Sequence, residues 1–263
     1  MNIHAEPQPS SLENVASRIR IVLVGTQHPG NIGAAARALK TMGLSRLVLV
    51  APEQYPADEA FRRAAGADDL LASANVVATL AEAVADCTFV LGCTARSRRV
   101  ALEELHPRIA GERVVEIARR EETALVFGRE RTGLSNEELQ LCHASVHIPA
   151  NPEYSSLNLA AAVQVLTYEV RVALLAAGAA VPAAGEENQE APANHAQLEG
   201  FFAQLGETLD DIDFHKGRAP ESAMRKLRRL FLRANLNEQE VRLLRGILAD
   251  AQRMARLAGG NPR

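Results

Sequence analysis

Short apolar runs recur along the first two thirds of the chain, and most of them end at a glycine or a polar loop. Such runs are typical of strands that are buried on both faces of a sheet. They predict strands at residues 20–25, 46–50, 88–92 and 124–127, with shorter ones at 76–77 and 145–149.

Segments with the apolar spacing of helices lie between these strands. They predict helices at residues 34–42, 59–72, 80–85 and 114–120, followed by a long helix from Leu159. Gly43 would end the first of them as a C-cap. Because strands and helices alternate, the sequence predicts an α/β fold, a parallel sheet with helices on both faces.

The pattern changes near residue 178. Residues 178–197 are rich in Ala, Pro, Gly and acidic residues without periodicity, which is typical of a linker. Amphipathic helices are predicted beyond it, so the chain divides into a domain at 19–177 and a small all-helical domain at 198–263. Residues 1–18 are predicted to be a disordered leader.

Composition narrows the class of protein. The 263 residues include 47% hydrophobic residues and carry a formal net charge of −3, which suits one good-sized domain and a small one. No apolar run is expected to span a membrane, and the N-terminus lacks the apolar core of a signal peptide, so we expect a cytoplasmic protein with no membrane partner. The three cysteines form no CxxC pair, and we predict neither a disulfide framework nor a metal site.

The second domain is locally basic, although the chain as a whole is acidic. Its basic residues include Arg225, Lys226, Arg228 and Arg229. A surface of this kind suits phosphate backbones and predicts binding to nucleic acid. The alternative is a solvated helix face with i,i+4 ion pairs, because charge runs are often only that.

Polar loops follow the predicted strands at their carboxyl ends, where open α/β sheets bind ligands. The loop after 88–92 contains Cys93, Thr94, Ala95 and Arg96. Cys93 has no activating neighbour in the sequence, so we expect a small buried residue rather than a nucleophile. The loop after 20–25 has two glycines at the Walker A spacing but lacks the lysine and the hydroxyl residue that contact phosphate and magnesium, so it supports a nucleotide site only weakly.

Three other residues invite a functional interpretation. His143 and His147 are four residues apart, but they lie in a predicted strand with no acidic residue between them as in HExxH, so we expect both to be structural. Arg37 falls near the positive end of its predicted helix, where a positive charge is unfavourable. It is therefore either an ordinary surface arginine or a residue with another role.

The polar residues after 124–127 also have two interpretations. Ser155, Ser156 and Asn158 precede the long helix and suit its N-cap as well as a binding loop. Glu130 stands between two arginines and suits a surface ion pair as well as a functional site. The residues alone leave these alternatives open.

Three segments taken together resemble the three motifs of the SpoU branch of the SPOUT methyltransferases. They are GNIGAAARAL at 30–39, VFGRERTGLS at 126–135 and IPANPEYSSLNLAAAVQVLTYE at 148–169. The likeness covers nearly the whole chain from Arg20. Within this branch the sequence is most similar to the bacterial enzymes that methylate the 2′-oxygen of cytidine or uridine 32 in the tRNA anticodon loop.

The resemblance implies a deep trefoil knot in the C-terminal part of the catalytic domain, folded around S-adenosylmethionine. It also implies a homodimer in which both subunits contribute to each site, with tRNA as the partner. Cofactor contacts would fall on Cys93, Thr94, Ala95, Gly128, Ile148, Ser155, Ser156 and Leu157. RNA contacts are expected at Arg37, Arg96, Arg225, Lys226, Arg228 and Arg229.

The resemblance further implies a catalytic set made of Arg37, Asn31, Glu130, Ser156 and Asn158. In the family the residue that matches Arg37 is proposed to help remove the proton of the 2′-hydroxyl. Arginine is a poor base, because its pKa exceeds about 12. Our hypothesis is therefore that Arg37 mainly stabilises the developing alkoxide. Two other functions stay open, a ribosomal RNA methyltransferase of the same branch and a non-catalytic RNA-binding protein on the same fold.

Overall fold

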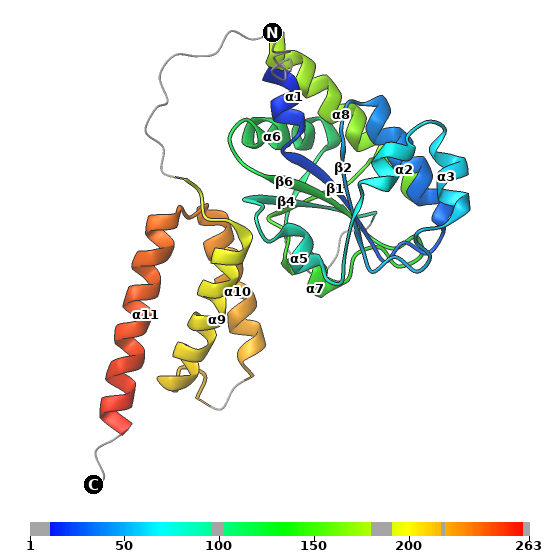
Figure 1. Cartoon of the computed structure of the whole chain (residues 1–263). Helices are drawn as coiled ribbons and strands as arrows, with labels where there is room; N and C mark the ends of the chain where they lie inside the picture. Colours follow the sequence, from blue (N-terminus) through cyan, green and yellow to red (C-terminus); the bar gives the residue numbers. More distant parts are fainter. Residues whose placement is uncertain (1–10, 96–101, 180–190, 217–218, 260–263) are drawn as a thin grey trace, which may run out of the picture. The chain divides into compact units, whose positions relative to one another are not determined.

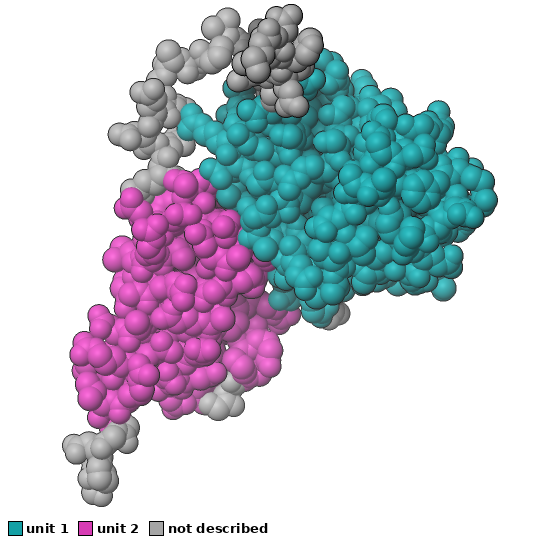
Figure 2. All heavy atoms as spheres, viewed as in Figure 1, with its two compact units in different colours: residues 1–183 teal, residues 184–263 magenta. Residues whose placement is uncertain are grey.

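A computed structural model describes residues 11–95, 102–179, 191–216 and 219–259. The chain forms two compact units, residues 1–183 and residues 184–263, which are coloured separately in Figure 2. Each unit is described by itself.

The first unit is built on a parallel sheet of seven strands in the order β3-β2-β1-β6-β4-β7-β5. The strands are β1 (Ile19–Val24), β2 (Arg46–Val50), β3 (Asn75–Val77), β4 (Phe89–Cys93), β5 (Glu103–Leu105), β6 (Thr123–Phe127) and β7 (Ala144–Val146). The six predicted strands are present, with ends shifted by up to three residues. The prediction missed β5, because it is an edge strand in which only Leu105 is buried.

Helices cover both faces of the sheet, which confirms the predicted fold class. Figure 1 shows α6 and α8 on one side and α5 and α7 on the other. The helices are α1 (Ser11–Ala16), α2 (Pro29–Thr41), α3 (Asp58–Ala64), α4 (Asp68–Ala72), α5 (Leu80–Val84), α6 (Pro107–Ala118), α7 (Asn136–Gln140) and α8 (Leu159–Ala179).

Helices α2 and α6 begin several residues earlier than predicted, at Pro29 and Pro107. Helix α2 begins at Pro29 because the proline suits the first helical position and the His28 ring accepts a hydrogen bond from the Gly30 amide at 3.1 Å. Arg37 is therefore in the second half of α2, and the prediction that it lies near the positive end of the helix dipole is wrong. Gly43, with φ of 74°, follows the helix as predicted.

Part of the predicted disordered leader is a helix. Helix α1 packs against α8, where Leu12 lies over Gly178, and Ala16 is buried. Residues 1–10 lie outside the described part of the chain. The expectation that no apolar run is long enough to cross a membrane is also wrong for α8 by length and composition. Its apolar composition is explained by Val163 and Val170, which are fully buried in the core of the unit.

The second unit contains α9 (His195–Asp211), α10 (Pro220–Ala234) and α11 (Glu238–Gly259). Its core includes Phe201, Phe202 and Leu205 of α9. The predicted linker extends too far, because Asn194 and Gln197 form a capping box that begins α9. Residues 180–190 lie outside the described ranges.

A charged cluster lies at the amino ends of strands β1 and β2. The guanidinium of Arg20, with 6% of its side chain exposed, donates to Asp86 at 2.6 and 2.7 Å and to Glu122 at 2.8 Å. Arg46 also pairs with Glu122. Burial raises the pKa of Asp86, but its bond to Arg20 and the charge of Arg20 lower it by more, so this pKa lies below its usual range.

We predict that Arg20→Ala lowers the free energy of unfolding at pH 7 by about 2 kcal/mol, because it removes the buried partner of two carboxylates. Arg46→Ala should cost less, because Arg46 is 37% exposed. A carboxylate with a lowered folded-state pKa contributes stability that is lost as the pH falls through that pKa. The difference in the free energy of unfolding between wild type and Arg20→Ala, measured with urea, should therefore become smaller at acidic pH. Equal decreases in the free energy of unfolding for Arg20→Ala and Arg46→Ala would contradict this account.

Candidate functional site

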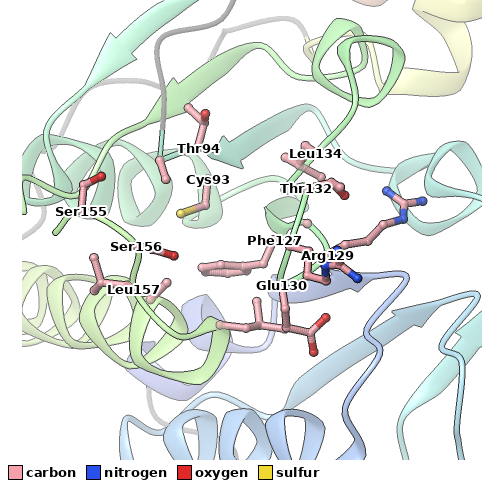
Figure 3. A pocket seen from close by; sticks show the side chains of 16 residues that line it. Cys93, Thr94, Phe127, Arg129, Glu130, Thr132, Leu134, Ser155, Ser156 and Leu157 are labelled. Carbon is pink, nitrogen blue, oxygen red and sulfur yellow. The ribbon is translucent and has the colours of Figure 1, made fainter.

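A cavity of 440 Å³ lies at the carboxyl ends of β4 and β6. Figure 3 shows side chains from three segments around it, namely the end of β4, the loop after β6 and the loop before α8. Its lining residues are Cys93, Thr94, Ala95, Phe127, Gly128, Arg129, Glu130, Arg131, Thr132, Gly133, Leu134, Ser155, Ser156, Leu157, Leu159 and Ala162.

Seven of the eight residues expected to contact a cofactor line this cavity: Cys93, Thr94, Ala95, Gly128, Ser155, Ser156 and Leu157. Ile148 does not line it and packs against the hydrophobic core instead. The sequence analysis missed Arg131, Thr132 and Gly133. Their position in the glycine-bounded loop after β6 is the signal that would have found them.

The loop after β6 folds back tightly on the end of the strand. A Cβ atom on Gly128 would lie 2.1 Å from the carbonyl carbon of Gly133 and 2.2 Å from the Leu134 nitrogen. Gly133 has φ of 66°, and its amide donates to the Arg129 carbonyl at 2.8 Å. Only glycine fits at position 128 without moving the loop.

The loop after β4 is held by β7. The Thr94 amide donates to the Val146 carbonyl at 3.0 Å, and Nδ1 of His147 lies 3.2 Å from the Thr94 carbonyl oxygen. His143 accepts from the Val90 amide at 3.1 Å. Both histidines therefore contact backbone groups of the β4 segment, which confirms the prediction that they are structural.

Cys93 is a half-buried residue at the edge of the cavity. Burial raises the pKa of its thiol to about 12. The thiol therefore stays protonated at neutral pH, which is the state of an inert packing residue rather than of a nucleophile.

Three polar side chains meet beside the cavity. Asn31 donates to a Glu130 oxygen at 2.9 Å, and Asn158 donates to the Asn31 side-chain oxygen at 3.0 Å. Glu130 also accepts from the amides of Gln27 and His28 at 3.0 and 3.2 Å. The network joins the N-terminus of α2, the loop after β6 and the N-terminus of α8.

This geometry excludes the ion-pair interpretation of Glu130. Its partner is Asn31, whereas the neighbouring Arg129 pairs with Glu138 at 3.0 Å, so the surface ion pair is wrong. Burial raises the pKa of Glu130, but the hydrogen bonds from Asn31 and from backbone amides lower it by more. Its pKa lies below the usual range, and the carboxylate is ionised at neutral pH.

The capping interpretation holds for one of the three polar residues before α8. The Asn158 side-chain oxygen accepts from the Ala160 amide at 2.9 Å, so Asn158 caps the helix as well as joining the network. Ser155 and Ser156 lie further from the helix, are exposed and line the cavity.

Arg37 is separate from this site within one chain. It is exposed on α2, does not line the cavity and makes no side-chain hydrogen bond or ion pair with the described residues. Arg96 lies outside the described residues. A single chain thus brings together Asn31, Glu130, Ser156 and Asn158, but not Arg37.

The sequence model of the SpoU rRNA Methylase family matches residues 18–168, and that of the tRNA methyltransferase TrmJ C-terminal domain matches residues 196–260. The chain belongs to the TrmJ branch of the SpoU methylases. The TrmJ of Pseudomonas aeruginosa, a tRNA (cytidine/uridine/adenosine-2′-O-)-methyltransferase, is 50% identical over 246 residues, which are 91% of this chain and 95% of that protein. The TrmJ of Cronobacter sakazakii, a tRNA (cytidine/uridine-2′-O-)-methyltransferase, is 51% identical over 235 residues, which are 89% and 96% of the two chains.

Solved structures agree with this assignment. The crystal structure of TrmJ from Z. mobilis superposes with a TM-score of 0.76 at 36% identity and covers 88% of this chain and 97% of its own. A probable methylase family protein from Haemophilus influenzae gives a TM-score of 0.59 at 41% identity, with 92% and 99% covered.

The TrmJ-type C-terminal unit arranges its basic residues in two ways. Arg225 and Lys226 are exposed on α10. Arg228 instead pairs with Glu199 and lies 4.5 Å over the ring of Phe202, and burial lowers its pKa to about 10. This side chain therefore holds α10 against α9, and its expected contact with RNA stays a prediction.

Arg229 is also partly buried, and its Nη1 has no hydrogen-bond partner in the described structure. Of the four residues of this unit that are expected to contact RNA, Arg225 and Lys226 are the two that are exposed.

Proposed function

We propose that the protein transfers a methyl group from S-adenosylmethionine to the ribose 2′-oxygen of nucleotide 32 in the tRNA anticodon loop. The observation that carries this proposal is the network of Asn31, Glu130 and Asn158 beside a cavity made of folded-back loops. The TrmJ relatives, which are tRNA 2′-O-methyltransferases, support the reaction and the substrate class. We place the enzyme in the cytoplasm.

The cavity fits S-adenosylmethionine by size and lining. Its 440 Å³ lies in the range of small-molecule sites. Phe127, Leu134 and Leu159 are buried apolar residues suited to a nucleoside, and Ser155 and Ser156 supply hydroxyl groups. When bound, S-adenosylmethionine supplies an electrophilic methyl group whose departure leaves a neutral sulfur.

The residues of the chain align the ribose and manage its proton. Glu130 fixes the Asn31 side chain, which in turn accepts from Asn158, so both amides are held in one orientation. Such preorganised groups can orient a 2′-hydroxyl for in-line attack. Arg37 stabilises the negative charge that develops on the 2′-oxygen as its proton passes to solvent and the methyl group would move from the sulfonium sulfur to that oxygen.

Arg37 does not line the cavity of its own chain. This role therefore requires Arg37 to reach the cavity of another subunit. We propose a homodimer with two-fold symmetry in which Arg37 of each subunit completes the cavity of the other. The exposure of Arg37 and its position outside the cavity of its own chain support this arrangement.

We also propose that the C-terminal part of the catalytic unit is a deep trefoil knot. The strand order supports it, because β6 lies between β1 and β4, and β7 lies between β4 and β5. The last two strands in the described part of the chain are thus inserted between strands that precede them in the sequence.

The proposed reaction is tested by labelled methyl transfer to unmodified tRNA and to ribosomal RNA, followed by nuclease mapping. We expect label in tRNA, on an alkali-resistant dinucleotide that contains position 32. Substrates with each of the four bases at position 32 will show whether adenosine is accepted, as it is by the Pseudomonas relative. Label in ribosomal RNA alone would contradict the proposed substrate, and absence of label from both would contradict the proposed reaction.

We predict that Gly128→Ala weakens the binding of S-adenosylmethionine by about tenfold or more, because the added methyl group displaces the loop that lines the cavity. Titration calorimetry measures the affinity. Gly246→Ala is the control, since a Cβ atom there meets no atom within 4 Å. Unchanged affinity in Gly128→Ala would show that the cofactor is held elsewhere.

A mixed dimer tests the contribution of Arg37 to the partner's site. Arg37→Ala should be nearly inactive as a homodimer, and Gly128→Ala should keep about a tenth or less of the wild-type activity when S-adenosylmethionine is well below the wild-type Kd. Purified mixed dimers, selected with two affinity tags, should regain about half of the wild-type activity, because one of the two sites is then complete. If Arg37 acts within its own chain, neither site is complete and the mixed dimer will be inactive.

A further inference from the structure

Arg37 of α2 and Arg63 of α3 are exposed residues on two helices that pack against each other. A Cβ atom on Gly33 of α2 would lie 2.0 Å from the Ala60 carbonyl oxygen and 3.0 Å from the Cβ of Arg63, so the two helix backbones are in close contact there. Arg37 follows Gly33 by one turn on the same side of α2. Arg37 and Arg63 therefore emerge next to each other at this contact.

Neither arginine has a counter-charge in the described part of the chain. Both are exposed, and neither makes a hydrogen bond or an ion pair with the described residues. Most other arginines in the described part of this unit form hydrogen bonds or ion pairs, as in the pairs of Arg20, Arg113 and Arg129 with carboxylates. Neighbouring like charges without counter-charges repel each other. An anion bound between Arg37 and Arg63 would remove this repulsion.

The nearby carboxylates have other neighbours. Asp69 pairs with Lys40 at 2.7 Å, and a Glu59 oxygen lies 4.0 Å from Nε2 of His28. Neither carboxylate forms an ion pair with Arg37 or Arg63. The two guanidinium groups remain available for a ligand with oxygen acceptors.

We propose that Arg63 binds the phosphate backbone of the RNA substrate beside the nucleotide whose 2′-oxygen Arg37 contacts. The inference rests on the proposed function, which supplies the RNA. Arginine suits this role because its planar fork binds phosphate oxygens in a bidentate manner. Arg63 is a positioning residue, since it sets the RNA strand in place for Arg37 and touches no reacting atom.

The test compares Arg63→Ala with Arg62→Ala. Arg62 lies on the same short helix and is also exposed, but the buried residues Ala60 and Ala64 face α2, so Arg62 lies on the opposite side. The two variants remove the same charge within the same helix. The probe is an in vitro transcribed tRNA with cytidine at position 32, used in filter binding and in methyl transfer.

We expect Arg63→Ala to weaken tRNA binding by about tenfold and to reduce the slope of log K against log salt by about 0.7, the loss of one single-strand phosphate contact. Arg63→Lys should restore part of the affinity. Affinity for S-adenosylmethionine, the mass of the dimer and kcat at saturating tRNA should stay within about twofold of wild type. Arg62→Ala should behave as wild type.

Three results would overturn the proposal: unchanged tRNA binding in Arg63→Ala, equal losses in both variants, or a loss that accompanies dissociation of the dimer. Failure of the proposed function gives a different result, since wild type would then transfer no methyl group to the tRNA. The binding comparison still decides the role of Arg63 in that case.

Discussion

The hydrogen bonds that join Glu130 to Asn31, and Asn31 to Asn158, are the interactions on which the site depends. They connect residues about a hundred positions apart in the sequence. The Gln27 and His28 amides add to them, so one carboxylate fixes the start of α2 and the loop after β6. Because this carboxylate is ionised and partly buried, its loss would leave several donors without an acceptor.

The sheet makes these bonds possible. Strand β6 lies between β1 and β4, so the loop after β6 emerges beside the loops that follow both neighbours. Close backbone contacts then set the shape of the surface. Gly128 lets the loop fold back on its own strand, and Gly33 lets α3 lie against α2. The contact at Gly128 shapes the cavity. The contact at Gly33 places Arg37 and Arg63 on the same side of the two helices.

Much of the fold was predictable from the sequence, because buried parallel strands are continuous apolar runs and can be recognised from these runs alone. The start of α2 was not, because Pro29 and His28 act through backbone geometry rather than through apolar spacing. Edge strand β5 was missed for a related reason, since two of its three residues are exposed glutamates.

The site was predictable in part. The loops were found because polar residues stood at strand ends, and the motif resemblance assigned them. The partner of Glu130 could not be read from its neighbours in sequence, because Arg129 is drawn to the Glu138 carboxylate of a helix cap. The role of Arg228 was hidden for the same kind of reason, since its ring contact and its ion pair come from α9. Tertiary contacts decided both cases.

The most direct test of the central claim is a comparison of cofactor affinity and turnover in Glu130→Gln. The account predicts that S-adenosylmethionine binds within about threefold of wild type while kcat falls by about a hundredfold, because the amide cannot hold the Asn31 and backbone donors as the carboxylate does. Unfolding in urea provides the control for folding. A variant that folds, binds the cofactor and keeps wild-type kcat would contradict the claim that this network organises catalysis.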